Sequence, residues 1–289
     1  MPILLLIESS PVLFVVLAIL LGLIIGSFLN VVTHRLPRML EREWQAHCAE
    51  LSGTEVAATE VYNLIVPRSR CPHCGHAISA LENIPLLSYL ALRGRCRKCQ
   101  ARISLRYPLI ELVTGILSGW VAWHFGFGWP ALGALLLTWT LIPLTAIDFE
   151  HQLLPDKLTL PLLWLGLIFN LGQNFTSLES AVAGALAGYL SLWCVFHGFK
   201  LLTGKEGMGY GDFKLFAALG AWLGWQMLPV IILLAAATGA IIGISLIVFR
   251  RLQQGVPMPF GPFLAAAGWI ALLWGHQLTD AYLGLTGVH

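Results

Sequence analysis

Eight long apolar runs constrain the fold of this 289-residue chain more than any other feature of its sequence. The runs are Pro11–Val32, Tyr107–Phe125, Ala131–Ile147, Leu158–Leu171, Leu178–Leu202, Phe213–Leu228, Val230–Phe249 and Phe260–Gly275. A helix needs about 20 mostly apolar residues to cross a bilayer, and the mean hydropathy of the whole chain is +0.77. The sequence therefore predicts an all-α polytopic membrane protein with about eight transmembrane helices.

Two of these runs are short for a membrane span. Leu158–Leu171 and Phe213–Leu228 fall below the usual range, so we expect neighbouring helices to shield them or a water-filled notch to border them. The first run has no basic n-region and no small-residue cleavage site before it. We therefore expect a retained span and not a removed signal peptide.

The basic residues predict how the chain is oriented in the membrane. Residues 35–106 are polar and hold eleven of the 17 Lys and Arg residues. If this segment is cytoplasmic, alternation of eight spans places the other six basic residues on the same side. We therefore expect a first transmembrane helix in residues 1–34, a cytoplasmic domain in residues 35–106 and a seven-helix membrane domain in residues 107–289. The net charge of +2 gives no reason to expect nucleic-acid binding.

Tryptophans accompany the short connections on the opposite side of the membrane. Four of them lie near these connections and fit an interfacial aromatic belt: Trp123, Trp129, Trp222 and Trp225.

Two C-x-x-C knuckles in the polar segment predict a metal site. They are Cys71–Cys74 and Cys96–Cys99, and 21 residues separate them. Four thiolates on two tight turns suit a tetrahedral zinc ion. Such a site is closed to water, so we expect it to stabilise the fold and not to catalyse a reaction. Disulfides are the alternative, although a cytoplasmic location disfavours them.

Two histidines near the first knuckle, His73 and His76, are alternative metal ligands, but four thiolates already complete the coordination. The other two cysteines, Cys48 and Cys194, are isolated in the sequence. We expect both to be inert.

Two aspartates sit at matching ends of apolar runs. Asp148 follows the third run, and Asp212 opens the sixth after a turn that contains Gly207, Gly209 and Gly211. Glycines allow positive φ and close approach of another segment. Asp212 alone could simply cap a helix. If both aspartates meet in a low-dielectric site, however, one can hold a proton as general acid while the other acts as general base, as in aspartic proteases.

Helix ends suggest which aspartate is ionised. Asp212 is expected at a helix N-terminus, where the dipole favours an anion, and Asp148 at a C-terminus, where it does not. This reasoning makes Asp212 the base and Asp148 the acid.

Several other titratable residues are candidates for a functional role. Glu150 and His151 follow Asp148 closely, and the simplest interpretation is that both are solvated. Asp156 lies where a helix cap is expected. Glu111 lies one turn inside the second run. An ionisable residue within a span is a functional candidate by default, although pairing with Arg106 or His124 is equally open.

The sequence resembles a known family. Gly209-Tyr210-Gly211-Asp212 resembles the G-x-G-D signature of intramembrane aspartyl proteases, and the chain as a whole resembles the bacterial type 4 prepilin peptidases, also called leader peptidase/N-methyltransferases. The matching segments are Gly26–Val32, Arg35–Pro37, the two knuckles with Asn83–Leu90 between them, Arg106–Pro108, Glu111–Leu112, Ile147–Asp148, Leu154–Asp156 and Met208–Lys214.

The resemblance implies that Asp148 and Asp212 are catalytic. It implies cleavage of the basic leader of type IV prepilins or type II secretion pseudopilins after a glycine, followed by methylation of the new N-terminal residue, usually phenylalanine. S-Adenosylmethionine would be the methyl donor, with residues 83–95, and Gly94 in particular, as candidates for binding it. The implied location is the bacterial inner membrane, with the zinc domain and the aspartates on the cytoplasmic side.

The physical properties of such a substrate agree with this topology. Its apolar helix can partition into the bilayer while its basic leader stays in the cytoplasm, which brings the cleaved bond to the inner edge of the membrane. Five glutamates between the first run and the knuckles could attract the leader, although such a group is usually a solvated face: Glu41, Glu43, Glu50, Glu55 and Glu60.

Two other functions compete with the peptidase. The aspartates could relay protons in a proton-coupled transporter, but the chain lacks the internal repeat common in such proteins. An assembly factor that docks a cytoplasmic partner through the zinc domain would leave the aspartate pair unexplained.

Overall fold

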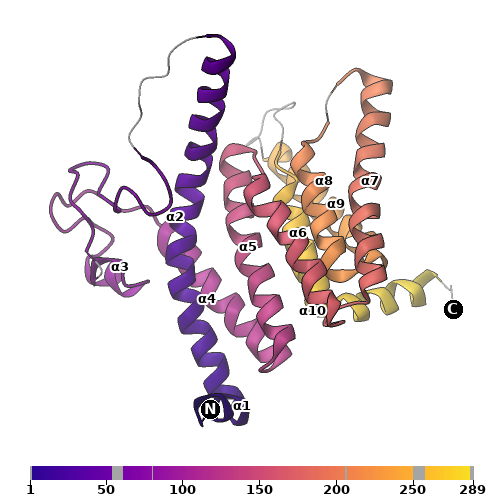
Figure 1. Ribbon diagram of the computed structural model, residues 1–289, viewed down its shortest axis with the longest axis horizontal. Helices are drawn as coiled ribbons and strands as arrows, with labels where there is room; N and C mark the ends of the chain where they lie inside the picture. The colour runs from indigo at the N-terminus through magenta and orange to yellow at the C-terminus, as the bar shows by residue number, and fades with distance from the viewer. Residues whose placement is uncertain (1, 54–60, 80, 206, 250–257, 287–289) are drawn as a thin grey trace. The chain divides into compact units, whose positions relative to one another are not determined.

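The computed structural model describes residues 2–53, 61–79, 81–205, 207–249 and 258–286 (Figure 1). Regular structure in these residues is helical apart from two isolated β-bridges. The chain forms two compact units, Met1–Phe127 and Gly128–His289. The first unit contains α1 (Pro2–Ser9), α2 (Pro11–Leu51), η1 (Leu81–Asn83), α3 (Leu87–Ala91) and α4 (Arg106–Phe125). The second contains α5 (Trp129–His151), α6 (Asp156–Leu171), α7 (Leu178–Thr203), α8 (Tyr210–Leu223), η2 (Trp225–Met227), α9 (Leu228–Val248) and α10 (Gly261–Thr286).

Helix α2 is much longer than the first apolar run. Ser10 caps its N-terminus by accepting a hydrogen bond from the N–H of Leu13 at 3.4 Å, and the helix continues for 41 residues through Pro37. The boundary expected between residues 34 and 35 therefore lies inside a continuous helix. At this boundary Arg35 is buried, and its guanidinium donates to the carbonyl oxygens of Asn63 at 2.8 Å and Pro67 at 2.6 Å.

Small residues bring α2 and α4 into close contact. A Cβ atom added to Gly26 of α2 would lie 2.7 Å from the Cα of Glu111, and one added to Gly119 of α4 would lie 2.5 Å from the Ile19 side chain. Gly22 and Gly115 complete a small-x-x-x-small spacing on each helix, the pattern that lets membrane helices approach closely. This packing assigns α4 to the same compact unit as the cysteine-rich segment.

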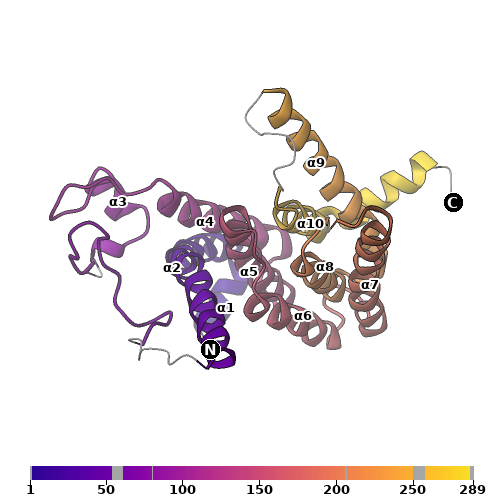
Figure 2. The same cartoon turned by 90° about the horizontal axis from the view of Figure 1, so that it is seen from above.

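Helix α8 is the centre of the second unit. It packs against α6, α7 and α10, which cover most of its 14 residues (Figure 2). The α7 contact is made backbone to backbone, because a Cβ on Gly220 or on Gly184 would collide with the facing main chain. The expectation that neighbours shield this short span is therefore confirmed.

The C-terminal end of α8 is held by polar contacts in a buried place. Trp222 is fully buried, and its indole N–H donates to the Leu162 carbonyl oxygen at 2.8 Å. The Asn170 amide donates to the carbonyls of Ala221 and Trp222, both at 2.9 Å. Trp222 is therefore a core residue, and its expected place in an interfacial belt was wrong. The other three belt tryptophans, Trp123, Trp129 and Trp225, are exposed.

Four helical segments of the described chain are both long and apolar enough to cross a membrane. They are Pro11–Leu51, Trp129–His151, Leu178–Thr203 and Trp225–Val248. The other four expected spans form α4, α6, α8 and α10, which fall short in length or in apolar character. Helix α10 is also interrupted, because Trp274 leaves the helical conformation. A count of eight spans therefore stays a prediction.

Candidate active site and metal centre

Asp148 and Asp212 come together inside the second unit. Asp148 lies in the last turn of α5 and is 5% exposed, and Asp212 lies in the first turn of α8 and is 7% exposed. The Asp148 carboxylate is close enough to act on Asp212 by electrostatic repulsion. Two carboxyl groups that interact in a buried place favour a state in which one of them holds a proton.

The start of α10 provides a partner for Asp148. The N–H of Gly261 donates to Oδ2 of Asp148 at 3.0 Å. A Cβ added to Gly261 would lie 2.6 Å from the same oxygen, so only glycine allows this approach without a shift. Sequence analysis missed Gly261. The available signal was its position between Phe260 and Pro262 at the start of an apolar run, which is typical of a turn.

Asp212 is not the N-cap of α8. The N-cap is Gly209, which has no side chain, and its backbone N–H is a donor to the Asp212 carboxyl group. Oδ1 of Asp212 is buried and has no hydrogen-bond partner in the described chain. A buried, unpaired polar atom costs about 1–3 kcal/mol, so its persistence needs an explanation such as a catalytic role or a bound water.

Close packing, and not positive φ, explains Gly207 and Gly211 in the turn. None of the three has a positive φ angle. A Cβ on Gly211 would lie 2.7 Å from the Cβ of Leu154, which belongs to the connection between α5 and α6. Leu154 also lies against Gly261. One leucine therefore packs between the turn that carries Asp212 and the residue that binds Asp148.

The other acidic candidates near the pair have different surroundings. Asp156 is the first residue of α6 and makes no cap, because its carboxylate accepts Nζ–H bonds from Lys214 at 2.6 and 2.7 Å. This ion pair joins the first residue of α6 to the second turn of α8. Glu150 lies 3.9 Å from His151, and both side chains are exposed, as expected for solvated residues.

Glu111 lies in the first unit, in α4, and is 8% exposed. Its Oε2 accepts a hydrogen bond from the N–H of Leu86 at 2.9 Å. The Ser27 hydroxyl is a second donor to this carboxyl group.

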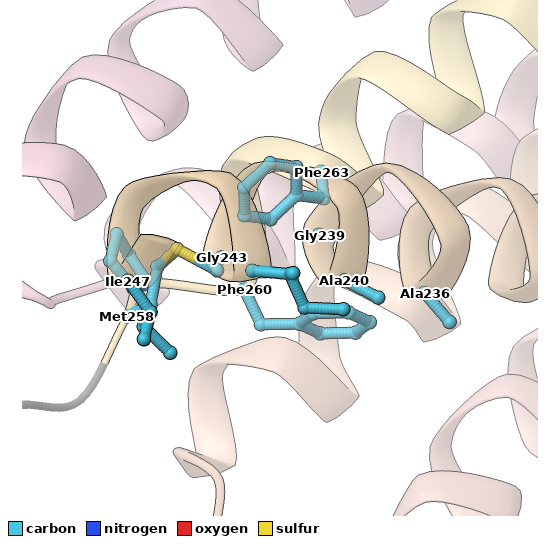
Figure 3. A pocket seen from close by; sticks show the side chains of 10 residues that line it. Ala236, Gly239, Ala240, Gly243, Ile247, Met258, Phe260 and Phe263 are labelled. Atoms are coloured by element: carbon cyan, nitrogen blue, oxygen red, sulfur yellow. The ribbon is translucent and has the colours of Figure 1, made fainter. Parts of the chain in front are cut away.

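An apolar groove lies between α9 and the segment that leads into α10 (Figure 3). Its volume is about 380 Å³, and one wall is the segment that leads through Phe260 into Gly261. The floor consists of small residues of α9, namely Ala236, Gly239, Ala240 and Gly243. Ile244, Ile247, Met258, Pro259 and Phe263 complete the lining. The groove can accept apolar groups, and Phe260 in its lining directly precedes Gly261, the residue that binds Asp148.

The four knuckle cysteines form one cluster in the first unit. Their sulfur atoms all lie within 4.8 Å of one another, with Cys71 to Cys99 at 3.8 Å and Cys74 to Cys96 at 3.9 Å. A tetrahedron with 2.3 Å metal–sulfur bonds has edges of about 3.8 Å. All of the cysteines are free thiols, so no disulfide competes with metal binding. The cluster could hold a metal ion.

The two knuckles have the same backbone structure. In the first, the N–H of Cys71 donates to the carbonyl of His76 at 2.9 Å, and in the second, the N–H of Cys96 donates to that of Ala101 at 2.9 Å. An isolated β-bridge closes each knuckle. The two knuckles therefore share the same pattern of backbone hydrogen bonds.

The backbone of each knuckle favours the thiolate of its first cysteine. N–H groups of Cys74 and His73 lower the pKa of the Cys71 thiol to about 7. The N–H of Cys99 lowers the pKa of Cys96 in the same way. Since metals bind the thiolate, this arrangement assists metal binding at neutral pH.

Two further candidates, His76 and Gly94, have structural explanations. His76 lies outside the cysteine cluster and pairs with Glu82 at 3.3 Å. Gly94 has a φ of 66°, and an added Cβ would lie 2.7 Å from the Tyr89 hydroxyl oxygen. The positive φ and the close contact with Tyr89 explain why glycine occupies this position, with no need to invoke a ligand. A role of Gly94 in binding a methyl donor stays a prediction.

Family models match both parts of the chain. The model described as the bacterial peptidase A24 N-terminal domain matches residues 20–125, and the model described as the type IV leader peptidase family matches residues 135–244. No solved structure gives a significant match.

Curated relatives match almost the whole chain. The prepilin leader peptidase/N-methyltransferase of Pseudomonas aeruginosa is 59% identical over 288 residues, which cover 99% of each chain. Relatives with the same name from Aeromonas hydrophila and Burkholderia pseudomallei are 62% and 55% identical, and they cover 96% and 93% of this chain and 96% and 87% of their own lengths. The chain therefore belongs to the type IV leader peptidase family.

Proposed function

We propose that this protein cleaves the basic leader of type IV prepilins or type II secretion pseudopilins after a glycine, and then methylates the new N-terminal residue, usually phenylalanine. The reaction would take place at the cytoplasmic face of the bacterial inner membrane. The observation that carries the peptidase assignment is the buried pair of Asp148 and Asp212, in which each carboxyl group has a backbone donor and Oδ1 of Asp212 is left unpaired. Membership of a family of peptidases supports the same assignment.

The contacts of the pair favour a division of labour opposite to that expected from the helix ends. Each carboxyl group has one backbone donor, Gly261 for Asp148 and Gly209 for Asp212, but Oδ1 of Asp212 is buried and has no partner. Leaving a buried acceptor unpaired costs about 1–3 kcal/mol and more when the group is charged, which outweighs the about 0.3–1 kcal/mol of a helix end. We therefore assign the base to Asp148 and the acid to Asp212.

In this mechanism Asp148 takes a proton from the attacking water. Asp212 gives its proton to the oxygen of the scissile carbonyl, which becomes more basic as the tetrahedral intermediate forms. The roles reverse when the intermediate collapses and the leaving amine needs a proton. Both carboxyl groups are buried, so bulk water does not compete for the hydrogen bonds that the intermediate requires.

The apolar groove would seat the apolar helix that follows the cleaved bond. One wall of the groove continues directly into Gly261, which binds Asp148. A chain that lies in the groove would therefore reach the active site at Asp148, the proposed general base. Its lining offers essentially no polar group, which suits a substrate segment that partitions into the bilayer.

The cysteine cluster would hold a structural zinc ion. Its four thiol groups, their spacing and the lowered pKa of Cys71 fit this ion, and four thiolates leave no position for water. S-Adenosylmethionine would supply the methyl group for the second reaction.

A cleavage assay with a prepilin and labelled S-adenosylmethionine tests the proposal. Wild-type protein should release the leader and label the new N-terminus. Asp148→Asn and Asp212→Asn should each abolish cleavage while a precleaved peptide is still methylated. Cleavage retained in both variants would refute the catalytic assignment. The control is Glu150→Gln, which changes an exposed acid beside His151 and should cleave like wild type.

A further inference from the structure

The contact between α2 and α4 contains a buried carboxyl group that the peptidase mechanism does not use. Glu111 is 8% exposed, and its donors are the Leu86 N–H and the Ser27 hydroxyl. Both donors are neutral. A buried carboxylate without a cation is costly, so a positively charged partner would stabilise it strongly.

A second acceptor in the same helix contact has no donor. Asn30 of α2 is 5% exposed, and its Nδ2 donates to the carbonyl oxygen of Tyr107 in α4 at 3.0 Å. This bond fixes the orientation of the amide, because the flipped amide would set two oxygens against each other. Oδ1 of Asn30 is buried and has no hydrogen-bond partner in the described chain.

The register of the two helices groups these acceptors. Gly26 of α2 packs on the Cα of Glu111. Asn30 lies one turn after Gly26, and its partner Tyr107 lies one turn before Glu111 in the antiparallel helix. Both acceptors therefore belong to a single contact between α2 and α4.

The Leu86 contact ties the cysteine-rich segment to this place. Leu86 has a φ of 57° and a ψ of −45°, an unfavourable conformation for a residue with a side chain. Its N–H is bound to Glu111 in this conformation. The loop between the two knuckles is thus held at the acceptors by a direct hydrogen bond.

The chemistry of the acceptors selects their ligand. One negative charge and one amide oxygen, both accepting, match a compact cation with several N–H donors. A divalent metal would need more oxygen ligands than these side chains offer. A primary ammonium group supplies one positive charge and three donors.

We propose that Asn30 and Glu111 form a binding site for a primary α-ammonium group. The proposal rests on the methyltransferase part of the proposed function, which brings two such groups to the protein: the new N-terminus of the cleaved substrate and the amino-acid end of S-adenosylmethionine. Both present the same chemistry, and the experiment separates them.

Binding is measured with purified full-length protein, so that the readout does not depend on turnover. The probes are a precleaved substrate peptide with a free N-terminus, the same peptide N-acetylated, and S-adenosylmethionine. Wild type should bind either the free peptide at least about tenfold more tightly than the acetylated one, or S-adenosylmethionine with an affinity that depends on Glu111. A factor of ten is the effect expected for a single charge-assisted hydrogen bond.

Glu111→Gln removes the charge and keeps the shape. If the substrate amine is the ligand, this variant should lose the preference for the free peptide. If the methyl donor is the ligand, its Kd should rise at least about tenfold while the peptide preference is unaffected. Thr114→Val is the matched control, because the Thr114 hydroxyl is buried in the same contact and only bonds the Ile110 carbonyl.

If Glu111→Gln does not fold, Asn30→Ala still tests the proposal, because this variant should weaken the binding of the same probe. Binding that is unchanged for all probes in both variants, or changed equally in Thr114→Val, would overturn the proposal. Leader cleavage by wild type is assayed in parallel. Its absence would count against the proposed peptidase function and not against the ammonium site.

Discussion

The N–H of Gly261, at the start of α10, donates a hydrogen bond to Oδ2 of Asp148, in the last turn of α5. The two residues are 113 positions apart in the sequence. Because Met258, Pro259 and Phe260 of the groove lining directly precede Gly261, this bond links the apolar groove to a buried carboxylate. The four predictions below follow from this geometry and from that of the knuckles.

Gly261→Ala should impair cleavage with little effect on folding. The added Cβ would lie 2.6 Å from Oδ2 of Asp148 and must displace the carboxylate. A small displacement of a catalytic group can lower kcat about tenfold to a hundredfold. Gly198→Ala on α7 is the control, since its Cβ would meet no atom within 4 Å. Equal kcat values for the two variants in the prepilin assay would contradict the role of Gly261.

Filling the groove should weaken substrate binding. Ala240→Leu occupies the floor of the groove and should raise KM for an intact prepilin about tenfold, or ~1.4 kcal/mol. Ala237→Leu adds the same side chain to an exposed position of α9 outside the lining and should leave KM unchanged. A similar KM in both variants would show that the substrate helix lies elsewhere, and lipid would then be the natural occupant.

The matching knuckles predict opposite effects of glycine substitutions. Gln100 has a φ of 59° at the position where the first knuckle has Gly75, with a φ of 69°. Gln100→Gly should therefore stabilise the metal-loaded protein by about 0.5–1 kcal/mol. Gly75→Ala should destabilise it, although its Cβ would touch nothing within 4 Å, because the backbone conformation alone is unfavourable. Thermal unfolding of the two variants provides the measurement, and shifts of the same sign would contradict the argument.

Metal analysis should separate the clustered cysteines from the isolated ones. Cys96→Ser removes one of the four sulfur ligands, so the purified variant should lose zinc and unfold at a lower temperature. Cys194→Ser is the control, because this thiol is exposed and outside the cluster. Zinc at full stoichiometry in the Cys96 variant would mean that the ion is bound elsewhere.

Most helix boundaries could be predicted from the sequence. The run Leu178–Leu202 became α7, Leu178–Thr203, and the run Tyr107–Phe125 became α4, Arg106–Phe125. The clustering of the cysteines also followed from their spacing. Both features are local, since burial of consecutive apolar residues defines a membrane helix and a tight turn defines a knuckle.

Errors arose where a residue's role depends on a distant partner. Trp222 looked like an interfacial residue but is covered by α6, and Asp156 looked like a cap but pairs with Lys214. Helix α2 continues through Pro37 to Leu51, beyond the expected boundary between residues 34 and 35.

The order of apolar and polar residues was enough to determine the helices, the knuckles and the two aspartates as candidates, because each of these depends on neighbours along the chain. Tertiary structure alone decided that Gly261 binds Asp148, that Oδ1 of Asp212 is left unpaired and that Asn30 faces the same contact as Glu111. These relationships depend on the register and rotation with which helices pack, and hydropathy carries no information about either.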